Sequence, residues 1–258
     1  MRRGFTLLEI LLAIGIIALL AAILLPVING AKVGGQVTAA LSNAKQLTEA
    51  ALLYSVDVDG NSPPSTAYNK KEALRKVWPE ILKEYLKSDA LLTAPGATPP
   101  PSRRYSDRGF LSWGLNADTA TNGSGCVGTS PDGVPCEGYR KALSFDSIPS
   151  NSALFATTPG GDPEQRYCGH EFEPNNGTRL LEDVAMSPPL VSDKDLVKVL
   201  PMLPCTALRP VYARYGSTGQ DDGRAVIGLF DGSAKAFTSK QLSSGAAKLV
   251  WRLRRVRG

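Results

Sequence analysis

A long apolar run opens the chain. Between Phe5 and Ile28 the one charged side chain is Glu9. At ~1.5 Å per residue, a helix of this length crosses a hydrocarbon core of ~30 Å. Arg2 and Arg3 precede the run, and no cation follows until Lys32. The positive-inside bias therefore predicts a membrane helix over residues 5–28, with the later residues outside the cytoplasm.

The pattern changes after residue 28. Pro26 lacks a backbone donor, so it predicts a kink or local melting of the helix, assisted by Gly30, Gly34 and Gly35. Apolar residues then recur at three- and four-residue spacing, which predicts that the helix resumes and runs to about Tyr54: Val37, Leu41, Ala44, Leu47 and Ala51. We expect residues 29–60 to form a helical spine and exit turn, and residues 61–258 a head domain outside the cytoplasm.

The head domain shows mixed patterning. Lys70–Lys87 has helical spacing, with Pro79 as the first residue of a second helix. Residues 94–138 are rich in Pro, Gly, Ser and Asn, which predicts loops around a short segment at 110–115. Runs of aliphatic, aromatic and β-branched residues predict strands at Ala153–Thr157, Pro210–Tyr215, Ala225–Phe230 and Ala234–Thr238.

The last two predicted strands are joined through a turn dipeptide. Asp231 and Gly232 stand between two apolar runs, which is a strong hairpin signal because glycine readily takes a positive φ. The predicted fold is therefore α+β, with a small antiparallel sheet packed on a long N-terminal helical spine.

Charge and cysteine content narrow the picture. The chain has 29 Lys and Arg against 24 Asp and Glu, so no large basic surface is implied. An even number of cysteines in an exported chain permits two disulfides among Cys126, Cys136, Cys168 and Cys205. The shortest loops would pair Cys126 with Cys136 and Cys168 with Cys205. Non-reducing peptide mapping would distinguish this from the other two connectivities.

The N-terminal motif carries a resemblance. The residues from Arg3 to Glu9, followed by the apolar run with Pro26 near its end, resemble the class III signal of type IV prepilins and type II secretion pseudopilins. The resemblance implies that prepilin peptidase cuts after Gly4, that the new amine of Phe5 is methylated, and that Glu9 neutralises this amine during assembly.

The same resemblance implies partners and a location. The precursor would lie in the cytoplasmic (inner) membrane, meet a pilus assembly platform, and polymerise with copies of itself into an extracellular filament. The segment from Ser42–Leu47 through Tyr54–Gly60 also resembles a narrower group of pilin-like proteins, whose helix ends in Tyr-x-x-Asp-x-Asp-Gly. Those proteins usually carry a His, nine residues and then Asp-Gly near the C-terminus, and Asp231-Gly232 matches the Asp-Gly. Asp221 stands here in place of that histidine, so no role of the histidine is carried over.

Candidate chemistry outside this motif is sparse. Asp57-Val58-Asp59-Gly60-Asn61 could begin a calcium loop, but the later ligand positions do not match, and a helix end with a turn is favoured. Cys168 and His170 could serve as a thiol nucleophile and its base, although a disulfide cysteine beside a surface histidine is favoured. We therefore expect no catalytic residues, metal or cofactor.

The C-terminal segment from Lys240 to Gly258 holds six cations and no acid: Lys240, Lys248, Arg252, Arg254, Arg255 and Arg257. It could bind DNA, anionic lipid or a neighbouring subunit, and a partly packed helix face is favoured over DNA binding. The predicted function is a structural filament subunit. A pseudopilin or minor pilin is the alternative, and a membrane-tethered hydrolase is the third hypothesis.

Overall fold

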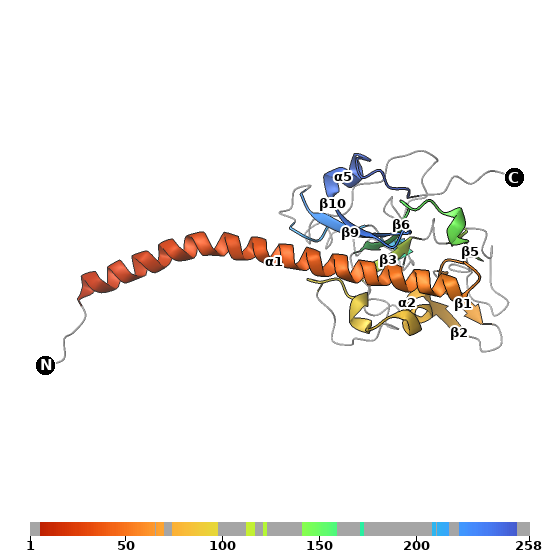
Figure 1. Cartoon of the computed structure of the whole chain (residues 1–258). Coiled ribbons are helices and arrows are strands. Elements are labelled where there is room, and N and C mark those ends of the chain that lie inside the picture. The colour runs from red at the N-terminus through yellow and green to blue at the C-terminus, as the bar shows by residue number, and fades with distance from the viewer. Residues whose placement is uncertain are drawn as a thin grey trace.

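The computed structural model describes the helical spine, the apolar run before it from residue 6 onward, and a large part of the head. The described residues are 6–64, 66–69, 74–97, 112–116, 121–122, 141–158, 171–172, 208–209, 211–216 and 222–251. They form an α+β fold in which one long helix, α1, supports a β-sheet (Figure 1).

Helix α1 spans Leu7–Asp57 and is 51 residues long. Of the kink or local melting predicted at Pro26, the local melting is wrong, because the helix is continuous through this residue. A proline removes one hydrogen bond of the ladder, which a long helix can lose while it bends. Figure 1 shows the result as a single curved rod, with its N-terminal half projecting away from the head.

The main sheet has six strands in the order β10-β9-β6-β3-β7-β8. Its four-stranded part is antiparallel, as predicted, and consists of β3 (Trp113–Asn116), β6 (Ala153–Thr157), β9 (Arg224–Leu229) and β10 (Ala234–Thr238). Two-residue strands β7 (Glu171–Phe172) and β8 (Leu208–Arg209) extend the far edge in parallel orientation. A separate pair joins β4 (Thr121–Asn122) to β5 (Lys141–Ala142).

The two faces of the sheet bury different clusters, because successive strand side chains point to opposite faces. On one face Val226 and Phe155 pack with the apolar stripe of α1. On the other face Ile227 and Leu229 pack with α5 (Ser239–Ser243) and with residues up to Trp251. Figure 1 shows the sheet between α5 and α1. The sheet is therefore covered on both sides.

The prediction of a helix over 70–87 is wrong at Leu74–Val77. These residues instead form strand β2, which pairs in an antiparallel hairpin with β1 (Thr66–Asn69). Pairing with β1 satisfies the backbone groups that the helix would have satisfied, and local spacing cannot show that partner. A short helix, α2 (Trp78–Ile81), follows, and it begins one residue before Pro79, which was predicted as its first residue. Two 3₁₀ turns follow α2 in the chain, η1 (Lys83–Tyr85) and η2 (Asp89–Leu92). Another, η4 (Phe145–Ser147), precedes β6.

The predicted strand over 210–215 is also wrong. Val211–Gly216 is irregular and touches the sheet through an isolated bridge between Tyr215 and Arg224. Tyr212 N donates to Thr157 O at 2.7 Å, and Thr157 Oγ1 donates to Tyr212 O at 2.9 Å. The segment is apolar because it covers the sheet, where Val211 and Ala213 are buried.

Candidate assembly helix and its anchorage in the head

The start of α1 is closed by a reciprocal capping box. Thr6 N and Thr6 Oγ1 each donate to Glu9 Oε2 at 2.8 Å, and Glu9 N donates to Thr6 Oγ1 at 3.3 Å. Such a box satisfies two donors that the first helical turn would otherwise leave without partners. Thr6 was not among the predicted site residues, although the sequence carries the signal of this box as Thr-x-x-Glu ahead of the apolar run.

The N-terminal half of α1 is exposed and apolar on every side. Its large apolar residues, from Leu7 to Ile28, are each more than half exposed. We call residues 7–28 the apolar rod. By length and composition α1 qualifies as a membrane-spanning helix, with none of the qualifying window buried within the molecule. An all-round apolar helix needs lipid or other helices as its surroundings, since water would leave this surface uncompensated.

The C-terminal half of α1 is amphipathic and holds the head. Buried residues lie along one face, including Ala44, Leu47, Thr48 and Ala51. Where Thr48 meets the sheet, the facing residue is Gly228, and a Cβ there would lie 2.6 Å from Thr48 Cγ2. Glycine therefore permits the close approach of helix and strand.

A hydrogen bond fixes this half of α1 to the β9–β10 hairpin. Thr48 Oγ1 donates to Gly232 O at 3.1 Å and to Lys45 O at 2.8 Å. Asp231 and Gly232 form the turn between the strands, Gly232 has φ 82°, and Ser233 N donates to Asp231 Oδ1 at 2.8 Å. The hairpin predicted from Asp-Gly is present in the structure.

Helix α1 ends in a turn, and its last residue also contacts the head. Asp59 and Gly60 have φ values of 47° and 74°, and Gly60 N donates to Ser55 O at 2.8 Å. Asp57 Oδ2 accepts from Tyr85 Oη at 2.9 Å, and this bond raises the pKa of Tyr85. Within the described residues, no group of three or more His, Cys, Asp or Glu side chains could hold a metal ion.

The buried hydroxyl of Tyr215 has a different environment. The side chain is 1% exposed, and its Oη has no hydrogen-bond partner among the described residues. Burial raises the pKa of Tyr215 to about 12, although the nearby Arg214 cation opposes the shift. The ionised phenolate is disfavoured because burial removes the solvation that its charge would need.

Several predicted site residues lie outside the described residues. These are the cleavage-site residues Gly4 and Phe5, all four cysteines, Asp221, His170 and the four C-terminal arginines. Glu9, Pro26, Asp231 and Gly232 are described. Glu9 and Pro26 lie in the apolar rod, whereas Gly232 contacts α1 at Thr48, in its buried half. The apolar rod and the hairpin are thus two distinct sites.

A known family model matches the N-terminal residues of the chain. Residues 1–25 match the family model of the prokaryotic N-terminal methylation motif. The chain carries this methylation motif. The motif is consistent with a type IV pilin or pseudopilin, and it implies processing by prepilin peptidase. No curated protein and no solved structure matches the chain.

The methylation motif and the apolar helix together fit a membrane-anchored precursor. The motif ends within the apolar rod, one residue before Pro26. The head domain therefore lies beyond the matched residues.

Proposed function

We propose that this chain is a structural subunit of a type IV pilus-like surface filament and polymerises through α1 after cleavage between Gly4 and Phe5. The apolar rod is the observation that carries the proposal. It projects from the head with its apolar side chains exposed, and the methylation motif occupies its start. A membrane can cover this surface in the precursor, and neighbouring rods can cover it in a filament.

The head is attached to the apolar rod through α1. One continuous helix forms both the exposed rod and the buried spine, so a force or packing contact on the rod passes directly to the sheet. The role is mechanical, and no step of it uses a cofactor, a metal or a catalytic side chain.

Isolation of surface filaments tests the proposal. Filaments sheared from wild-type cells should contain this chain, beginning at N-methylated Phe5, and a deletion strain should lack them. A Gly4 variant that blocks cleavage is the control, because it should leave the chain in the membrane. If the chain forms a minor component or a periplasmic fibre, it acts as a minor pilin or pseudopilin. If it is absent from every filament while the motif is cleaved, the proposed function is wrong.

A further inference from the structure

Two exposed apolar residues lie outside the apolar rod. Among the described residues beyond residue 28, the large apolar side chains that are strongly exposed are Leu53 and Val56, at 56% and 79%. Both stand on the last turns of α1, on the side that the head does not cover. Their position marks a surface that a partner could bury.

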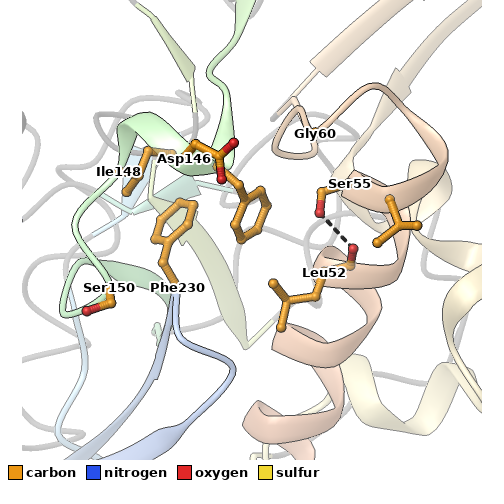
Figure 2. A pocket seen from close by; sticks show the side chains of 9 residues that line it. Leu52, Ser55, Gly60, Asp146, Ile148, Ser150 and Phe230 are labelled. Carbon is orange, nitrogen blue, oxygen red and sulfur yellow. Dashed lines mark hydrogen bonds between the residues drawn. The ribbon is translucent and has the colours of Figure 1, made fainter.

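A pocket adjoins these residues. We call it the distal groove; it has a volume of about 470 Å³ and is lined by Leu52, Ser55, Val56, Gly60, Phe145, Asp146, Ile148, Ser150 and Phe230. Figure 2 shows Leu52 on α1 facing Phe230 across the groove, with Asp146 and Ile148 along the opposite wall. The rings of Phe145 and Phe230 lie 5.0 Å apart and form its apolar floor.

Charge distinguishes the groove from a plain apolar surface. Asp146 is exposed at the rim and makes no ion pair within the described part of the chain. Lys32, the first cation after the apolar rod, is likewise exposed and without an ion pair there. The groove, which combines apolar side chains with one acid, thus has a counterpart on the same chain: the apolar rod followed by one base, Lys32.

We propose that the distal groove receives Ile28 of a second copy of this chain, with Lys32 of that copy paired to Asp146. Ile28 and Lys32 are four residues apart in a continuous helix, so they share one face. Ile28 is 54% exposed in the isolated chain. This inference rests on the proposed function and assigns it a particular contact.

The contact sets the stagger of the two copies. From Ile28 to Leu52 is 24 residues, which corresponds to roughly 36 Å along the helix. With parallel helices displaced by this distance, the apolar rod of one copy runs along the exposed face of α1 in the other. The Lys45–Glu49 ion pair on that face, 3.8 Å apart, carries no net charge. Each copy offers one groove and one rod, and such a heterologous contact repeats into an open filament.

Charge reversal tests the pair. Asp146→Lys and Lys32→Asp should each lower the yield of sheared filaments about tenfold, because each places like charges in contact, and the double variant should restore it to within about twofold. Glu84→Lys is the matched control, since Glu84 is exposed and does not line the groove. Wild-type yield from both single variants, or a double variant as poor as the singles, overturns the proposal.

Cross-linking tests the occupant. With p-benzoyl-phenylalanine in place of Val56, irradiated filaments should link this position to the tryptic peptide of residues 5–32 of another copy. A link to a different protein or to a different segment overturns the inference but leaves the filament function standing. Absence of this chain from all surface filaments overturns the proposed function itself, so the two failures are distinguishable.

Discussion

Thr48 and Gly232 are 184 residues apart in sequence, and the Thr48 hydroxyl donates to the Gly232 carbonyl at 3.1 Å. This bond joins the middle of the spine to the turn of the β9–β10 hairpin. Thr48 is fully buried, whereas Gly232 at the turn is partly exposed, so the threonine hydroxyl has no access to bulk water. The bond thereby fixes where along α1 the sheet rests.

Thr48→Val should destabilise the head. Valine keeps the shape of threonine but leaves the Gly232 carbonyl without this donor, which costs about 1–2 kcal/mol in the free energy of unfolding. Thr38→Val is the matched control, because Thr38 also donates to a helix carbonyl, Gly34 O at 3.0 Å, but is exposed. Urea unfolding of the detergent-solubilised chain measures both. Equal effects of the two substitutions would show that the hairpin contact contributes nothing.

Gly232→Val and Gly30→Ala should change stability in opposite directions. Gly232 has φ 82°, and a Cβ there would lie 3.0 Å from Leu52 Cδ1, so valine should cost about 1–3 kcal/mol. Gly30 lies within α1 with nothing within 4 Å of an added Cβ, so alanine should stabilise the helix by about 0.5–1 kcal/mol. Thermal melting compares them, and an unchanged melting temperature for Gly232→Val would contradict the strained turn.

Tyr215 should make the head sensitive to alkaline pH. Its pKa is raised to about 12 in the folded chain, so the unfolded chain loses this proton first as pH rises. The stability due to the neutral phenol is complete below pH ~10 and is lost as pH rises toward ~12, by about 2–3 kcal/mol at most. Tyr215→Phe should remove that part of the loss while leaving stability at pH 7 unchanged or slightly higher. Urea unfolding at pH 7, 10 and 11.5 gives the difference, and parallel pH curves for both proteins would refute the assignment.

Glu9 should govern assembly without governing insertion. Cleavage after Gly4 would create an amine at Phe5, next to the capping box in which Glu9 Oε2 accepts from Thr6. Glu9→Ala should therefore be inserted and cleaved but give about tenfold fewer filaments, and Glu9→Asp should be intermediate because its carboxylate has a shorter reach.

Thr6 variants separate the cap from the charge. Thr6→Ala removes the hydroxyl that caps the helix, whereas Thr6→Ser keeps it. We expect Thr6→Ser to assemble like wild type and Thr6→Ala to assemble less well than Thr6→Ser. Sheared yield and N-terminal mass report assembly and cleavage separately. Wild-type filament yield from Glu9→Ala would remove the role assigned to this carboxylate.

The sequence by itself was enough for the elements whose signals are local. The all-round apolar residues of the rod and the one-sided stripe from Val37 to Ala51 predicted the two environments of α1. Strand β6 was predicted with its observed bounds, as was β10, and Asp231-Gly232 marked the turn before β10. Each of these signals depends on neighbours within a few residues, where spacing and backbone preference act directly.

Only the tertiary structure decided the remaining features of the fold, because those features depend on partners that are distant in sequence. Leu74–Val77 has helical spacing but becomes a strand, since β1 provides its ladder. Pro26 stays inside an unbroken helix, and Val211–Gly216 covers a sheet that it does not join as a ladder strand. The distal groove combines the end of α1 with residues 145–150 and Phe230. No local pattern encodes such a meeting, because burial of apolar surface rewards whichever segments the completed fold brings together.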